Sequence, residues 1–308
     1  MVRKGKSRIQ HSRLLLLAAA FFAMGCAVLY FAYPRKKPAV EQVFCVVSVN
    51  GGAYEKLEQV FIKKGDRLLI LPVFVVNGEQ LSANQSQGLS CDWYLIEPQY
   101  YEYDNFEGAP KNAFASHIVP ISYKRTMLMN AESLDFSEDE FGVYYIQAAA
   151  KDSVQERFFE SDNGLIFGGD TLQIVYREDD SYLGYLSELM RSPFVMYPKL
   201  LEEGHQTDLL IGSDCAEFVI YGRRRLGYDI PYCGPKLIYD YLSPQEVPMP
   251  GDILHYGSQV SVFYEDRGVI GAVDDEDIVL QSYDYRPYFT TIRDNNHVFG
   301  IFELYRWK

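Results

Sequence analysis

A cysteine at the start of a predicted helix is the residue with the clearest capacity for chemistry. Residues 211–228 read IGSDCAEFVIYGRRRLGY, and apolar residues recur at helical spacing from Cys215 to Leu226. Asp214 is a good N-cap residue and Glu217 follows it three positions later, so Cys215 falls in the first helical turn. The unpaired N–H groups of a helix N-terminus stabilise a thiolate, which makes Cys215 a candidate nucleophile. A buried cysteine that serves as a small apolar side chain is the alternative.

Four motifs in the same region resemble one enzyme family. Residues 214–219 read DCAEFV and residues 225–231 read RLGYDIP, which resembles the DCSGFV…LGxxIP signature of the NlpC-type papain-like cysteine peptidases. PGDIL at 250–254 resembles the family's PGDLxxF strand, and QVSVFY at 259–264 resembles its HVGIY strand. The resemblance covers about residues 180–308. It implies a hydrolase of peptidoglycan stem peptides in which Cys215 is the nucleophile and Asp214 helps to hold the substrate.

The general base of that family is missing from its usual position. Gln259 stands where the family has a histidine, and an amide takes up no proton near neutral pH. Gln281 corresponds to the polar residue that orients the base. His255 is the nearest replacement: a two-residue turn at 257–258 would make it face Val260 and point away from Gln259, whereas a bulge or a three-residue turn would put it on the Gln259 face. A structural or surface role is the alternative for His255.

Other ionisable residues do not form a recognisable site. We expect His205 and His297 to be structural, and the five histidines and five cysteines show no zinc-ligand spacing. The acidic run 274–277 lacks EF-hand spacing and is typical of a solvated turn. No glycine-rich phosphate loop occurs. The sequence therefore predicts no metal and no other cofactor.

The fold around the cysteine follows from these patterns and from the resemblance. Residues 181–191 and 198–204 are predicted to form short helices, Gly227 is predicted to end the cysteine helix, and residues 223–225 are predicted to point mostly to solvent. Several later runs are predicted strands. The resemblance implies an α+β papain-like domain at 180–308, in which the cysteine helix lies on a twisted antiparallel sheet. Cys233 could pair with Cys215 or remain a buried thiol.

Residues 43–176 show strand patterns throughout. Short apolar or alternating runs are separated by Gly, Asn and Ser, which predicts an all-β sandwich. CDW at 91–93 and FGVYY at 141–145 resemble the Trp-bearing strand and the tyrosine corner of immunoglobulin-like domains. Cys45 and Cys91 could form a disulfide or remain buried thiols. No catalytic set is evident, so a spacer or partner-binding role is expected.

The first 42 residues have the pattern of a membrane-targeting segment. Residues 1–37 contain eight Lys or Arg and no acid, and residues 14–33 form an uncharged apolar run long enough to cross a bilayer. We therefore predict a basic cytoplasmic segment at 1–13, a transmembrane signal anchor at 14–33 and a linker at 34–42. Lipidation of Cys26 is the alternative form of attachment.

The charge balance excludes some classes of partner. The chain has a formal net charge of −13, and residues 38–308 contain 21 basic against 42 acidic residues. Such an acidic body repels nucleic acid, because phosphate binding requires clustered Lys and Arg. Nucleic acid is therefore not expected as a partner.

These observations lead to one predicted function and two alternatives. We predict a membrane-anchored cysteine hydrolase of bacteria, single-pass with its soluble domains on the extracytoplasmic side, that cleaves a peptide or amide bond in peptidoglycan. The first alternative is a catalytically impaired module that binds a cell-wall peptide or an envelope protein. The second is a structural spacer in which no Cys215 substitution has an effect.

Overall fold

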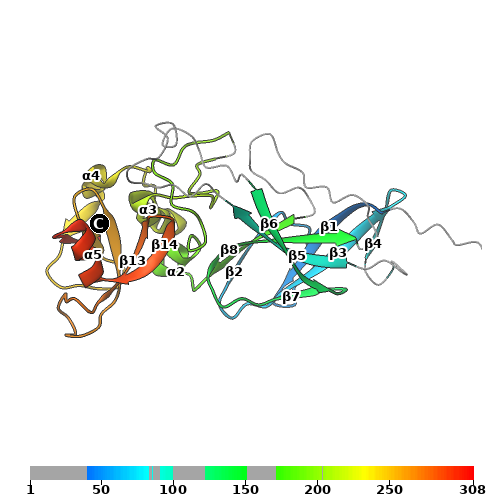
Figure 1. Cartoon of the computed structure of the whole chain (residues 1–308), viewed down its shortest axis with the longest axis horizontal. Helices are drawn as coiled ribbons and strands as arrows, with labels where there is room; N and C mark the ends of the chain where they lie inside the picture. Colours follow the sequence, from blue (N-terminus) through cyan, green and yellow to red (C-terminus); the bar gives the residue numbers. More distant parts are fainter. Residues whose placement is uncertain (1–39, 83–84, 86–90, 100–121, 151–170, 203) are drawn as a thin grey trace, which may run out of the picture. The chain divides into compact units, whose positions relative to one another are not determined.

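The computed structural model describes residues 40–82, 85, 91–99, 122–150, 171–202 and 204–308. Within these residues the strands form three sheets (Figure 1). One four-stranded sheet has the order β1-β3-β4, with β7 also pairing with β3; its strands are β1 (Val40–Val49), β3 (Leu68–Val76), β4 (Glu79–Ser82) and β7 (Leu134–Phe136). These strands pair antiparallel.

The second sheet has five strands in the order β2-β9-β8-β5-β6. Its strands are β2 (Gln59–Lys63), β9 (Thr171–Arg177), β8 (Gly142–Ala150), β5 (Cys91–Gln99) and β6 (Ser122–Asn130). Only the β2–β9 pair is parallel. The first and second sheets share one apolar core, because buried side chains of β1 and β3 pack with those of β5, β8 and β9.

Strand alternation explains this shared core. Residues Leu68, Ile70 and Phe74 of β3 are buried at alternate positions, and Trp93 of β5 is fully buried against them. Each such side chain contributes roughly 1.5–3 kcal/mol on burial. The Trp93 indole N–H donates to the carbonyl of Ala131 at 3.1 Å, so its polar atom is also satisfied.

Tyr144 is anchored by a local hydrogen bond. Its phenol hydroxyl donates to the backbone carbonyl of Glu140, four residues upstream. Gly142, between them, has φ +128, and a Cβ there would meet the backbone of Arg191 at 2.8 Å. Glycine is therefore required for this close approach.

The third sheet contains the six strands that follow residue 241. Its order is β10-β15-β11-β12-β13-β14, and every pair is antiparallel. The strands are β10 (Leu242–Pro244), β11 (Ile253–His255), β12 (Val260–Glu265), β13 (Ile278–Tyr283), β14 (Arg286–Thr291) and β15 (Glu303–Trp307). The helices are α2 (Tyr182–Ser187), α3 (Cys215–Arg225), α4 (Pro235–Ile238), the 3₁₀ turn η2 (Tyr239–Tyr241) and α5 (Ile292–Phe299).

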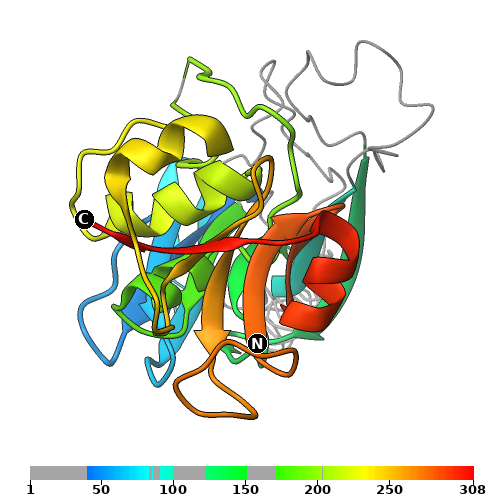
Figure 2. The ribbon, with the colours of Figure 1, turned by 90° about the vertical axis from the view of Figure 1, so that its left-hand side faces the viewer.

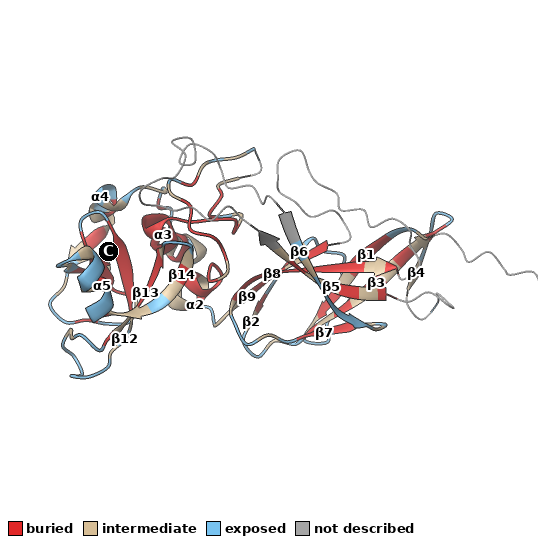
Figure 3. Cartoon of the chain, viewed as in Figure 1, coloured by how far each residue is buried: buried red, intermediate tan, exposed pale blue. Residues whose placement is uncertain are grey.

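Helices α3 and α5 lie on opposite faces of this third sheet (Figure 2). Val260 and Val262 of β12 pack with the α3 side chains, whereas Phe263 packs with Ile292 of α5. Helix α3 is buried along residues 215–222, whereas α5 is mostly exposed (Figure 3). The alternation of side chains along β12 therefore decides which residues can meet Cys215.

The fold class predicted from the sequence is wrong. That prediction combined an α+β papain-like domain, an all-β sandwich and one transmembrane helix. Instead, 44% of the described residues lie in strands of three sheets and 15% in helices, so the protein is mostly β. Its longest described helix, α3, has only 11 residues, because Asp214 starts it and Gly227, at φ +93, lies just past its end.

Two predicted segments differ from the structure or lie outside its described part. Residues 198–204 are not helical where described; Leu200 and His205 instead form an isolated β-bridge. The segment 14–33 and Cys26 within it lie outside the described residues. No helix of the described part is both long and apolar enough to cross a membrane.

Candidate functional site

The helix that begins at Cys215 is capped as predicted. The Asp214 carboxylate accepts the backbone N–H of Glu217 at 2.8 Å, and N–H groups of Ala216 and Tyr197 also bond to it. Asp214 is 8% exposed, and burial raises the pKa of its carboxyl to about 6. Its oxygens are therefore occupied by the backbone, and the contact between Asp214 and a substrate stays a prediction.

The thiol of Cys215 is held in its neutral form. Cys215 is 6% exposed, and burial raises its pKa to about 12, with a further increase from the neighbouring Asp214 carboxylate. Backbone N–H groups of Val260, Ala216 and Cys215 itself lower the pKa, but less than burial raises it. The helix N-terminus was expected to favour the thiolate; desolvation outweighs that effect here.

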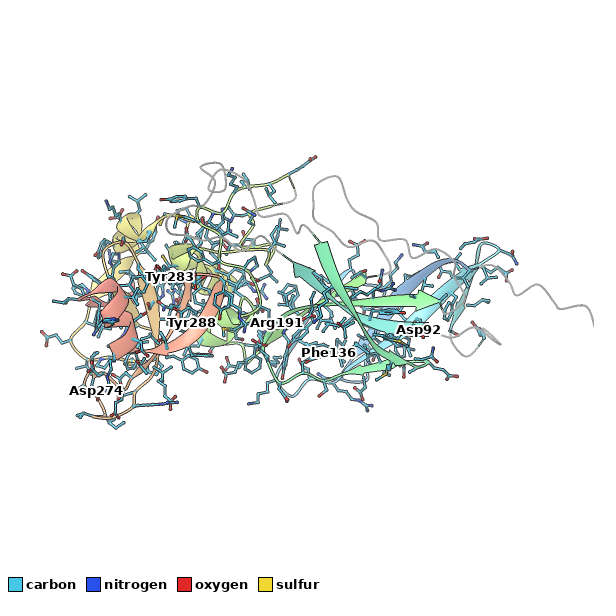
Figure 4. The ribbon with its side chains drawn as sticks, viewed as in Figure 1. Asp92, Phe136, Arg191, Asp274, Tyr283 and Tyr288 are labelled. Atoms are coloured by element: carbon cyan, nitrogen blue, oxygen red, sulfur yellow. The ribbon has the colours of Figure 1, made fainter. Side chains whose placement is uncertain are left out.

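Gln259 and Gln281 lie together, but in an amide network. The Gln259 Nε2 amide is 3.5 Å from Gln281 Oε1, and Gln281 Nε2 donates to the Tyr288 hydroxyl at 2.8 Å (Tyr288 is labelled in Figure 4). The Ser261 hydroxyl donates to Gln281 Oε1 at 3.2 Å and accepts from Asn295 Nδ2 at 2.8 Å. None of these groups takes up a proton near neutral pH.

This network belongs to the α5 face of the third sheet. Asn295 lies on α5, and Ser261 alternates with Val260 and Val262, which face α3. Cys215 packs in the α3 core with those two valines. Among the described residues, no hydrogen bond joins the Gln259 amide to the Cys215 thiol. The structure therefore brings Gln259 to Gln281 and leaves Cys215 on the other face.

His255 bonds to groups other than the Cys215 thiol in the described part of the chain. It pairs with Val260, and Tyr256 N–H donates to the carbonyl of Gln259 at 2.8 Å, which is the arrangement expected for a two-residue turn. Its Nδ1 accepts the N–H of Gly257 at 3.0 Å and lies 2.8 Å from the Tyr239 hydroxyl.

The other ring nitrogen of His255 is also occupied. Nε2 lies 2.8 Å from the carbonyl of Pro235, which can only accept, so Nε2 carries a proton. The ring stacks on Tyr239 with centroids 3.9 Å apart. His255 is therefore a core histidine whose two ring nitrogens are both occupied, and its role as the base stays a prediction that these contacts do not favour.

The contacts of His205 are to groups other than the Cys215 thiol. Its Nδ1 lies 3.6 Å from Glu217 Oε2, its ring stacks on Tyr232 at 4.3 Å, and burial lowers its pKa. The Thr207 hydroxyl donates to Glu217 Oε2 at 2.6 Å. Burial, aided by Asp214, raises the pKa of Glu217 to about 8. His297 is exposed on α5.

The three arginines at 223–225 are half-buried, and each contacts an aromatic ring or a carboxylate. Arg223 lies over the Tyr228 ring at 3.5 Å from its centroid. Arg224 pairs with Asp208 at 3.2 Å, and Arg225 pairs with Glu188 at 2.9 Å. They were predicted to point mostly to solvent, whereas each guanidinium packs against a side chain of a neighbouring segment.

The acidic run and the cysteines bring no further reactive group. The carboxylates of Asp274 and Asp277 accept backbone N–H groups of Val269 and Arg267, both at 2.7 Å, which ties down a turn. No cluster of three metal-ligating side chains occurs in the described part of the chain. Neither a Cys45–Cys91 nor a Cys215–Cys233 disulfide is formed there.

A cavity of about 340 Å³ lies beside α2, and its lining includes none of the candidate residues Cys215, Gln259, Gln281 and His255. Four separate segments line it: 139–141 before β8, Glu178 after β9, α2 with the turn that follows it, and strands β12 to β14. Its walls are mostly apolar. No local spacing could have predicted this cavity, because its lining residues come from four segments that only folding brings together.

Comparisons with known proteins add no relative. No family model matches the chain, and neither a curated protein nor a solved structure matches it.

Proposed function

We propose that this protein binds a peptide or protein partner and does not cleave it at Cys215. The state of the Cys215 thiol carries this proposal. A pKa of about 12 leaves on the order of one thiolate in 10⁵ at pH 7, and a cysteine hydrolase depends on that thiolate. Binding requires no ionised thiol.

The surroundings of the thiol support the same conclusion. Nucleophilic catalysis requires a base within hydrogen-bond reach of the nucleophile. Gln259, at the position expected for that base, bonds to another amide, and both ring nitrogens of His255 have partners. Among the described histidines, none is hydrogen-bonded to Cys215.

Slow hydrolysis is the second candidate, and one observation favours it. Backbone N–H groups of Val260, Ala216 and Cys215 bond to the Cys215 thiol. N–H donors clustered beside a nucleophile are the kind of group that stabilises a developing oxyanion. Turnover would require substrate binding to ionise the thiol. The resemblance to NlpC-type peptidases, the cell-wall or envelope partner and the extracytoplasmic location stay predictions.

The test compares the full chain with its Cys215→Ala variant. Each is incubated with peptidoglycan fragments, cleavage products are followed by mass spectrometry, and retention of fragments is measured by equilibrium dialysis. We expect no cleavage from either protein and equal binding by both. Products formed by the wild-type chain and absent with Cys215→Ala would overturn the proposal in favour of the hydrolase.

A further inference from the structure

We propose that the cavity beside α2 binds a basic side chain of a peptide, with the aliphatic stem inside and the cationic head at the carboxylates of Asp139 and Glu178. This inference rests on the proposed binding function and names a site and a ligand class for it. The lining of this cavity includes neither Cys215 nor the amides of Gln259 and Gln281.

The size and walls of the cavity fit an apolar stem. About 340 Å³ is at the small end of the range for ligand pockets, so it accommodates one long side chain better than a larger ligand. Its apolar lining comes from Phe141, Leu183, Met190, Leu280 and Phe289. The methylene groups of a basic side chain pack favourably on such a surface while the charged head stays at the edge.

The charges around the cavity fit a cationic head. Glu140 is already paired, with Arg191 at 3.2 Å and with Arg286 at 3.3 Å. Asp139 and Glu178 have no Lys or Arg within ion-pair distance in the described part of the chain. The cavity therefore has two carboxylates without a cationic partner, which repel an anion and attract a cation.

Tyr264 lies beside the Glu178 carboxylate and contributes an aromatic ring to the cavity wall. Its hydroxyl donates to Glu178 Oε2 at 3.1 Å. Burial raises the pKa of Tyr264 to about 12, and the Glu178 charge adds to this increase. The Tyr264 and Phe289 rings meet edge to face with centroids 4.6 Å apart, and both line the cavity. Aromatic faces of this kind favour a cation over a neutral head.

The adjacent edge strand favours a peptide over a free amine. β14 ends the third sheet, so no described strand pairs with its outer edge. Phe289 of β14 pairs with Leu280 of β13, and both side chains line the cavity. A peptide strand added beside β14 would place alternate side chains on this same face, next to Phe289.

The test is a titration of the full chain with three matched peptides. The probe is Ac-Thr-Val-Lys-Val-Thr-NH₂, and its central lysine is replaced by norleucine or by glutamate; hexylamine is the free-amine arm. Affinity is measured by calorimetry at low salt. We expect the lysine peptide to bind at least about tenfold more tightly than the norleucine peptide and than hexylamine, and to weaken as salt is added.

Charge-removing variants locate the site. Glu178→Gln and Asp139→Asn keep side-chain size and should each weaken lysine-peptide binding at least about threefold, with no effect on the norleucine peptide. Glu276→Gln, an exposed carboxylate in the 274–277 turn, is the matched control and should bind as wild type. Circular dichroism of each variant checks that it folds.

Three outcomes would overturn the inference: equal affinity for the lysine and norleucine peptides, wild-type binding by both cavity variants, or hexylamine binding as tightly as the peptide. Each is distinct from failure of the proposed function. Peptidoglycan cleavage that requires Cys215 would overturn that function, and the lysine preference could still be measured in the Cys215→Ala chain.

Discussion

Arg225 on α3 donates to the carboxylate of Glu188 at 2.9 Å, and Glu188 is completely buried. The same carboxylate accepts from Arg177 at 3.2 Å and from the Tyr221 hydroxyl. Because Arg177 ends β9 and Glu188 follows α2, one buried acid ties together the second sheet, α2 and α3.

Removal of this acid should destabilise the protein strongly. Glu188→Ala leaves the Arg225 guanidinium and the buried Tyr221 hydroxyl without this partner, although Arg177 keeps its ion pair with Asp180. We expect the free energy of unfolding to fall by about 3–5 kcal/mol. Denaturant unfolding followed by circular dichroism measures it. Glu276→Ala, on the surface, is the control and should change stability by less than about 0.5 kcal/mol. An equally small effect of Glu188→Ala would mean that the network contributes little.

Cys215 should react slowly with alkylating reagents. Burial raises its pKa to about 12, and the reagent must also reach a side chain that is 6% exposed. We expect iodoacetamide to label Cys215 at pH 7 at least about 100-fold more slowly in the native chain than in guanidinium chloride, as followed by peptide mass spectrometry. Fast native labelling at Cys215 would contradict the neutral-thiol description on which the binding proposal depends.

The Gln281–Tyr288 bond should show measurable coupling. Gln281 is 1% exposed, so its replacement by Leu leaves buried polar partners unsatisfied and should cost about 1–3 kcal/mol. In a double-mutant cycle with Tyr288→Phe, we expect a coupling free energy of about 0.5–1.5 kcal/mol. Strict additivity would show that this hydrogen bond contributes nothing to stability.

Glu217 should make stability fall as pH rises. Its pKa is raised to about 8 by burial and by Asp214, from an ordinary value of 4.5. Between these values the folded state holds a proton that the unfolded state has lost, so this stabilisation is complete below about pH 4.5 and disappears as pH rises through 8.

The matching measurement is the difference between wild type and Glu217→Gln. The variant carries no titrating group at this position, so the stability of the wild type relative to the variant should decline across that window. Unfolding free energies at pH 5, 6.5 and 8 test this. A relative stability that rises with pH would show that the carboxylate is stabilised as an anion, for example by His205.

Local chemistry allowed some features to be predicted from sequence. The N-cap contact of Asp214 with Glu217 joins residues three positions apart, and the C-terminal glycine of α3 acts through its own backbone, so neither depends on distant packing. The geometry of the turn at 257–258, with His255 opposite Val260, follows from the same short-range rules. The helix predicted at 198–204 does not form, because a segment of this length is too short to be stable as a helix without supporting contacts.

By itself, the sequence determined where α3 begins and ends, and that acidic residues outnumber basic ones in the chain after residue 37. It also determined that amides, and not histidines, stand at positions 259 and 281. Only the tertiary structure decided that Cys215 packs on one face of the third sheet while the Gln281 network lies on the other, and that residues 223–225 are occupied by partners. It also decided the cavity, whose charges and walls come from four segments. The reason is physical: capping depends on neighbours in sequence, whereas the pKa of a thiol and the charge of a cavity depend on desolvation and on side chains brought together by folding.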